Sequence, residues 1–360
     1  MDKYSSFISP TRRNMATPRA LVENGIAHFG TFDKEFEILN ILDCQNPTAL
    51  GNFFKKKKLT LWEAMEVNLT DGYLLAVCCD MGIFGLGFNV FYDKATKKVY
   101  SWTTNVKSKD TKIAENLMGG KESSIDCPEM LIRYINNFEK GEVTVDGHQG
   151  DSSSGKIEYH FDLKALSKAS IVSIPFGKNR PLCTEKQFFK ADGYLNFNGK
   201  EYKVDESTVA VIDDHRAYYP RHAHYDWLTS MGKKGDKYMA FNLTANQSTD
   251  PTKYNENLIW KEGSSSLLPP VHFIRNRKTI DFVSETATPT VWEIKDDNDM
   301  VNLKFYVTGV YKDHENHAGV VQINYFVAFG KLEGYVRDEN GTLYDYTGED
   351  AMGEDKTLLL

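Results

Sequence analysis

The stretch that decides the fold runs from Val211 to Trp227 and reads V-I-D-D-H-R-A-Y-Y-P-R-H-A-H-Y-D-W. A strand with one buried face alternates apolar and polar residues. Val209, Val211 and Asp213 fall on one face in this alternation, which places a carboxylate in line with core positions. Burying a charge without a partner is costly, and Arg216 is a nearby counter-ion. We therefore predict a strand that carries a functional or structural ion pair.

The same two-residue alternation recurs along most of the chain. Residues 59–69 and 156–163 keep their apolar side chains on one face, and Gly- or Asn-containing turns separate such runs. Residues 130–138 fit a helix or a strand, and the strand is favoured because Glu139-Lys140-Gly141 would turn it into a hairpin. Many short strands with almost no convincing helix predict an all-β protein of antiparallel barrels or sandwiches.

The length of 360 residues favours two domains. Chain-breaking residues concentrate near 175–183, where the sequence contains P-F-G-K-N-R-P. We predict four parts: an N-terminal extension (1–24), a first β domain (25–180), a second β domain with the main motif (181–349) and a flexible acidic tail (350–360).

Composition narrows the classes of function. A net charge of −7 argues against a general nucleic-acid binder. No apolar run approaches the ~18 residues that a membrane helix needs, and no secretory signal is visible, so a cytoplasmic protein is expected. The five cysteines lack the C-x-x-C spacing of zinc sites. Neither a dinucleotide-binding glycine motif nor a G-x-S-x-G elbow is present, and no cofactor is expected. The oligomeric state stays open.

Several motifs in a fixed order resemble an uncharacterised family, domain of unknown function 2804. They are K-L-T-L-W-E-A-M (58–65), T-E-K (184–186), D-D-H-R-A-Y-Y-P-R-H-A-H-Y-D-W (213–227), F-N-L (241–243), E-N (256–257) and F-G-K-L-E-G (329–334). The resemblance runs roughly from Gly25 to Glu349. It implies two lipocalin-like β-barrels or sandwiches with an apolar cavity. Hydratases of the hydroxyneurosporene synthase type and tocopherol cyclases are similar at a greater distance.

The family's functional pattern can be carried over position by position. Its polar and tryptophan positions fall on Asp213, Arg216, Trp227, Asn242, Glu256 and Asn257, and its proline falls on Pro220. Two positions depart from it. Ala217 stands where glycine is usual, and Tyr225 stands where a second tryptophan is common.

One face of the strand after Pro220 carries Tyr225 and Trp227, which either line a pocket or belong to the core. Trp260 is expected to complete such a pocket, with Asn242 and Asn257 holding a polar group of the ligand. Asn242 alternates away from its apolar neighbours, so it reaches a cavity only if both sheet faces are covered. The opposite face carries His222, His224 and Asp226, which are weak candidates for a metal site and otherwise a hydrogen-bonded strand face.

Two functional hypotheses remain. The first is a binding protein for an apolar or amphipathic small molecule, held in a barrel or between the domains. The second is a hydratase, isomerase or cyclase acting on a terpenoid-like or lipid substrate, with Asp213 or Glu256 as the acid and Arg216 as its partner. A purely structural Asp213–Arg216 ion pair is the alternative to the catalytic role.

Overall fold

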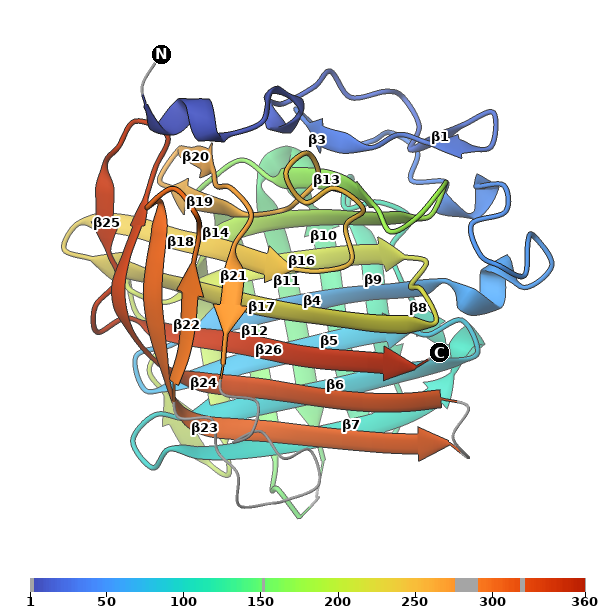
Figure 1. Ribbon diagram of the computed structural model, residues 1–360. Coiled ribbons are helices and arrows are strands. Elements are labelled where there is room, and N and C mark those ends of the chain that lie inside the picture. The colour runs from blue at the N-terminus through green and yellow to red at the C-terminus, as the bar shows by residue number, and fades with distance from the viewer. Residues whose placement is uncertain (1–2, 151–152, 276–290, 318–320, 360) are drawn as a thin grey trace. The chain divides into compact units, whose positions relative to one another are not determined.

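The computed structural model describes residues 3–150, 153–275, 291–317 and 321–359, whose regular secondary structure is almost entirely β-strand (Figure 1). The strands form a fourteen-stranded sheet, a ten-stranded sheet and a two-stranded hairpin. The all-β prediction is confirmed. The chain divides into two compact units: Asn14–Tyr219, and Met1–Arg13 together with Pro220–Leu360.

The first unit contains the fourteen-stranded sheet, the small hairpin and four 3₁₀ helices. The strands are β1 (Val22–Glu23), β2 (Ile26–Ala27), β3 (Gly30–Phe32), β4 (Thr60–Asn68), β5 (Gly72–Asp80), β6 (Phe84–Asp93), β7 (Lys98–Lys107), β8 (Thr111–Lys112), β9 (Lys121–Asp126), β10 (Met130–Asn137), β11 (Glu142–Gln149), β12 (Ile157–Ala165), β13 (Ser170–Pro175), β14 (Pro181–Phe197), β15 (Lys200–Tyr202) and β16 (Val209–Ala217). The 3₁₀ helices are η3 (Ile41–Asp43), η4 (Lys55–Lys58), η5 (Ser108–Asp110) and η6 (Phe138–Lys140). The strand prediction for 130–138 is confirmed by β10.

This sheet curls around a single core. Its strands follow the order β7-β6-β5-β4-β16-β14-β12-β11-β10-β9-β8. Trp102 from β7 and Ile125 from β9 lie near opposite ends of that order, yet both belong to one cluster of buried apolar side chains. The Tyr134 hydroxyl on β10 also donates to the carbonyl of Ala76 on β5 at 2.8 Å. The two ends of the sheet therefore face each other across a barrel-like interior.

The second unit contains the ten-stranded sheet and two 3₁₀ helices. Its strands are β17 (His222–Lys234), β18 (Lys237–Ala245), β19 (Leu258–Lys261), β20 (Ser264–Leu267), β21 (His272–Ile274), β22 (Val291–Lys295), β23 (Val301–His317), β24 (Val321–Arg337), β25 (Leu343–Asp345) and β26 (Asp350–Leu359). The helices are η1 (Tyr4–Phe7) and η2 (Pro10–Arg12). Long neighbouring strands β17, β26, β24 and β23 run side by side (Figure 1). One sheet face packs around a second core that includes Leu228, Trp292 and Phe305.

The predicted boundary near residue 180 differs from the observed division. The breakers between Pro175 and Pro181 form the turn of the hairpin β13–β14, closed by Phe176 N–H donating to the Arg180 carbonyl at 2.8 Å. The units separate between Tyr219 and Pro220 instead. Pro and Gly mark turns within a sheet as readily as linkers, which is why composition misplaced the boundary.

The two predicted terminal segments also differ. Residues up to Arg13 belong to the second unit, where Ile8 joins its core, so the extension 1–24 is divided. The predicted flexible tail is wrong, because β26 pairs with β17 on one side and β24 on the other. Its acidic side chains Glu354 and Asp355 are buried against partners. A charge count could not reveal those partners.

Both faces of β16 are buried, although one-face alternation was expected. Ala210 and Ile212 belong to the first core. Asp214 and Arg216 follow them on that face, and Asp213 points to the opposite one. The prediction that Asp213 shares the core-facing side was therefore off by one residue. Within the described residues, no helix has the length and apolar character needed to cross a membrane.

Candidate functional site

Three carboxylates lie side by side on neighbouring strands inside the first unit. Glu185 on β14 is directly opposite Asp214 on β16, and Asp214 is directly opposite Glu63 on β4. Each alternates in step with core residues of its own strand, such as Met65, Ile212 and Phe189. Their exposures are 1% or less. We call Glu63, Asp214 and Glu185 the acid row.

The acid row contacts one guanidinium. Arg216 Nε lies 2.9 Å from Asp214 Oδ1, and Nη2 lies 3.0 Å from Oδ2. Its Nη2 also donates to the Ala114 carbonyl at 2.7 Å. Arg216 thus forms a bidentate pair with Asp214, which is the strongest geometry for such a contact. Glu63 and Glu185 receive only longer-range stabilisation from the same cation.

Burial dominates the protonation of the row. Desolvation, followed by the charge of Asp214, raises the pKa of Glu63 to about 8. The same two causes raise the pKa of Glu185 well above its usual range. The pKa of Asp214 is raised by desolvation, against the opposing effect of Arg216. Near neutral pH the row therefore holds protons that exposed carboxyls would have lost.

The row is rich in acceptors that have no donor among the described residues. They are both carboxyl oxygens of Glu185, Oε1 of Glu63, Oδ1 of Asn136 and Oε1 of Gln187. Asn136 on β10 is fully buried, and its Nδ2 donates to Glu63 Oε2 at 3.0 Å, which orients its amide oxygen. Buried acceptors normally find donors, so this group points to a functional role.

The expected Asp213–Arg216 pair is not formed. Lys186 Nζ lies 3.0 Å from Asp213 Oδ2, and the Thr184 hydroxyl donates to Asp213 Oδ1 at 3.3 Å. Arg216 is on the other face of β16 and pairs with Asp214. Asp213 and its lysine are both buried, with exposures of 5% and 4%.

Three predicted residues, together with Tyr325, share the face of the ten-stranded sheet that lies opposite its core. Tyr225, Trp227, Trp260 and Tyr325 all have exposures of 8% or less there, and we call them the aromatic face. Tyr225 donates to Glu354 Oε2 at 2.9 Å, and Tyr325 donates to Oε1 at 2.5 Å. The aromatic face is therefore buried but polar at its tips.

Amides complete this face. Trp227 Nε1 donates to Asn242 Oδ1 at 2.7 Å, and Asn242 Nδ2 donates to the carbonyl of Glu256 at 3.0 Å. Asn242 is fully buried, as its position on a sheet covered on both faces requires. The indole N–H of Trp260 has no partner among the described residues.

Glu256 and Asn257 follow a loop that leads into β19. Asn257 Nδ2 donates to the Pro269 carbonyl at 3.0 Å, and its Oδ1 accepts from Thr244 N–H at 2.6 Å. Its carbonyl accepts from Arg12 at 2.8 Å. These bonds hold the loop in place. Glu256 is the main negative charge near the buried Arg12 guanidinium, whose pKa desolvation lowers to about 9.

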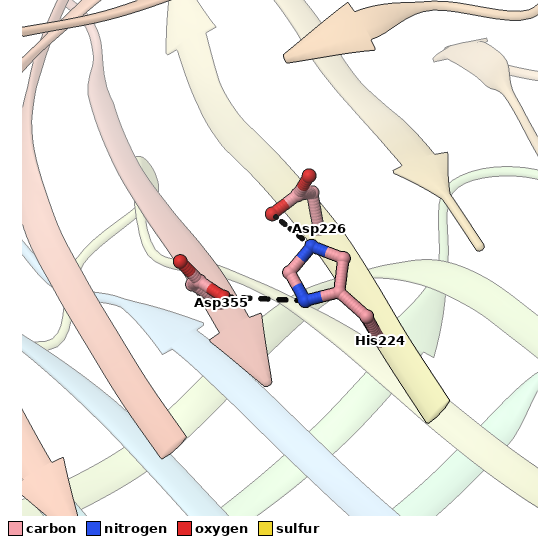
Figure 2. Close-up of side chains that lie close together, drawn as sticks. All are labelled: His224, Asp226 and Asp355. Atoms are coloured by element: carbon pink, nitrogen blue, oxygen red, sulfur yellow. Dashed lines mark ion pairs between the residues drawn. The ribbon is translucent and has the colours of Figure 1, made fainter. Parts of the chain in front are cut away.

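His224, Asp226 and Asp355 form the group in the described residues whose ligand atoms lie within 4.8 Å of one another (Figure 2). His224 Nε2 is 3.3 Å from Asp226, and Nδ1 is 3.6 Å from Asp355. Arg275 contacts both aspartates, with 3.0 Å to Asp355. A cation is already supplied by the guanidinium, which argues against a metal. His222 is exposed and lies outside this group.

Sequence reasoning gave Asp214 and Glu185 no role and took Glu63, with Trp62, as a weaker candidate than the residues above and as a packing residue. Glu63 interrupts the apolar face formed by Leu61, Met65 and Val67, which is the signal that would have marked it. Asp214 was passed over for its neighbour Asp213. Asn136 gave no signal, because its closeness to Glu63 depends on the curvature of the sheet.

Comparison with known proteins now identifies the family. The model of the family "Domain of unknown function (DUF2804)" matches residues 14–357. The chain belongs to this family. No functionally curated protein matches this DUF2804 chain.

Solved structures confirm the fold of the DUF2804 chain. CghA with Sch210972 matches with a TM-score of 0.51 and 10% identity, covering 84% of this chain and 88% of CghA. An AttH-like protein from Nitrosomonas europaea matches with a TM-score of 0.50 and 9% identity, covering 82% and 92%. Kievitone hydratase from Nectria haematococca is also similar, with a TM-score of 0.48, 12% identity and coverage of 83% and 88%. At these identities the likeness concerns architecture alone.

Proposed function

We propose that the protein binds an apolar or amphipathic small molecule against the aromatic face. The observation that carries this proposal is a buried indole N–H on Trp260 that lacks a partner among the described residues, on the same sheet face as aromatic side chains with polar tips. Large aromatics with a few oriented polar groups are typical of small-molecule sites. Glu354 and Asn242 would orient a ligand, since their own side chains are held by Tyr225 and Trp227.

The core face of the same sheet also contains a buried tryptophan, Trp292, whose indole N–H has no partner among the described residues. Trp292 packs edge-to-face against Phe305, and the Arg275 guanidinium lies over its ring. The two tryptophans therefore offer a matched pair for testing which face takes a ligand.

The test uses cis-parinaric acid, a fluorescent amphipathic probe, titrated into the full chain. We expect saturable quenching of tryptophan fluorescence. Trp260→Phe should weaken binding about fivefold to tenfold, because an aromatic contact and a donor are lost. Trp292→Phe, the control on the core face, should leave affinity unchanged. Equal affinities in both variants, or no saturable binding in the wild type, would rule out the proposal.

Acid catalysis on a terpenoid-like or lipid substrate is the second candidate. Its proposed acids are Asp213 and Glu256, but Asp213 is 3.0 Å from Lys186, and Glu256 is the main negative charge near Arg12. A carboxylate in a buried ion pair with a lysine has a structural role that explains it without catalysis. Simple binding is therefore the better-supported function.

A further inference from the structure

The acid row is unusual because its carboxyl groups outnumber the cation beside them. Glu63, Asp214 and Glu185 face Arg216, and Arg216 already donates to Asp214 and to a carbonyl. Five buried acceptor atoms around the row remain without donors among the described residues, counted on Glu185, Glu63, Asn136 and Gln187. What complements such a surface is a positively charged group with several N–H donors.

Asn136 supplies an observation that is independent of the acids. Its amide is uncharged and fully buried, and its Nδ2 bond to Glu63 directs Oδ1 as an acceptor. Protonation of a neighbouring carboxyl gives the unpaired amide oxygen a hydrogen-bond donor only if the new O–H points toward that oxygen. A ligand donor is the alternative.

We propose that the acid row and Asn136 form a binding site for a small primary amine, whose ammonium group donates to Glu63, Glu185 and Asn136. The proposal does not rest on ligand binding at the aromatic face, which belongs to the other unit. An amine fits better than a metal ion. A metal ion needs several ligand atoms close together. Among the described residues, ligand atoms within 4.8 Å of one another are found at His224, Asp226 and Asp355 and not in the acid row. An ammonium group contacts its acceptors through N–H···O bonds of about 2.9 Å, which are longer than the bonds from a metal ion to its oxygen ligands. Its acceptors can therefore lie farther apart than metal ligands do.

The row lies toward one end of the curled sheet. Leu61 is paired with Arg216 on one side and with Asp80 on the other, and both Leu61 and Asp80 are half-buried. Glu35, also half-buried, acts electrostatically on Glu185. A small amine would therefore approach from this end, past further negative charge.

Protons compete with the amine for this site. The charged and titratable groups acting on the row are Glu35, Glu63 (β4), Cys78 (β5), Tyr134 (β10), Cys183 and Glu185 (β14), and Asp214 and Arg216 (β16). Burial raises the pKa of Glu63 to about 8, so the free site is largely protonated at neutral pH. An ammonium, whose own pKa is about 10, must displace a proton to bind. Affinity should therefore rise with pH up to about 8 to 9, by at most about tenfold per unit for each proton displaced.

The experiment is calorimetric titration of the full chain with methylammonium chloride at pH 7, 8 and 9. Each titration is run in two buffers of different ionisation enthalpy, which counts the protons released. We expect binding with proton release and a rise in affinity over this range. Tetramethylammonium, which has the charge but no N–H group, and methanol, which has no charge, should each bind at least about tenfold more weakly.

Variants locate the site. Glu185→Gln and Glu63→Gln should each weaken methylammonium binding at least about tenfold, because a charged acceptor is lost. Glu142→Gln is the control, since Glu142 is exposed at the start of β11. Thermal unfolding checks that each variant folds. The wild-type titration alone is decisive if they do not: absent binding, or binding without proton release, overturns the proposal. Equal binding by a folded Glu185→Gln variant overturns it too.

Discussion

The two faces of β16 handle adjacent aspartates in opposite ways. Asp213 has its own cation, Lys186 at 3.0 Å, and a threonine hydroxyl. Asp214 shares Arg216 with two further carboxyls that are directly in line across neighbouring strands. One face carries a single buried ion pair, and the other has three carboxyls beside one cation inside a core. Burial alone does not identify a site, since both aspartates are buried. The number of carboxyls that share each cation distinguishes the two faces.

Removing the cation of the acid row should produce the largest effect. Arg216→Met leaves Asp214 buried without its partner, and we expect a loss of about 3 to 5 kcal/mol in the free energy of unfolding. Urea unfolding at pH 7 measures it. The loss should shrink at pH 5, where the carboxyls of the row can take up protons instead. A loss below about 1 kcal/mol at pH 7 would show that the row does not need its arginine.

Substitution on the opposite face of β16, where Asp213 pairs with Lys186, should cost less stability, and the cost should not depend on pH in this way. Asp213→Asn keeps the hydrogen-bonding shape but leaves Lys186 uncompensated, which should cost about 2 to 3 kcal/mol. Urea unfolding at pH 5 and pH 7 should give nearly the same cost. An unchanged stability combined with lost turnover of a substrate would instead restore Asp213 as a catalytic acid.

The pH dependence of the free energy of unfolding gives a further test of the difference between the two faces of β16. The pKa of Glu63 rises from 4.5 to about 8 on folding, so the folded protein binds more protons between these values. Stability is therefore greatest below the lower value and falls as pH rises through the window, by on the order of 1 kcal/mol per pH unit. Glu63→Gln cannot titrate and should flatten this slope. Parallel pH profiles of wild type and variant, measured by urea unfolding, would contradict the prediction.

The aromatic face should give the smallest effects. Tyr225→Phe and Tyr325→Phe each remove one donor to Glu354, at an expected cost of about 1 to 2 kcal/mol. The double variant leaves Glu354 without either hydroxyl and should cost more than the sum of the single changes. Thermal unfolding of all three proteins tests this. Strict additivity would show that the two hydroxyls act independently.

The sequence predicted the architecture better than the site. Strand alternation and turn residues were sufficient for the all-β class, because side-chain direction follows directly from the period of two. The aromatic face was also within reach, since Tyr225, Trp227 and Asn242 fall on one side of their strands by counting alone.

Sequence alternation could not predict which strands distant in the sequence pair with one another. Glu63, Asp214 and Glu185 come together only through the register of three strands that are distant in sequence. Choosing Asp213 over Asp214 was a one-residue error, and such an error reverses the face of every side chain. The burial of Glu354 and Asp355 in β26 likewise depends on neighbours more than 100 residues away, such as Tyr225.

Infrared difference spectroscopy of Glu63 tests most directly whether the first unit stores protons in its interior. Wild-type and Glu63→Gln proteins are compared from pH 5 to pH 10. We expect a protonated-carboxyl stretch in the wild type at pH 6 that is absent from the variant and disappears as pH rises past about 8. A carboxylate signal from Glu63 already at pH 6 would mean that burial does not raise the pKa of Glu63 and that this part of the acid row holds no proton near neutral pH.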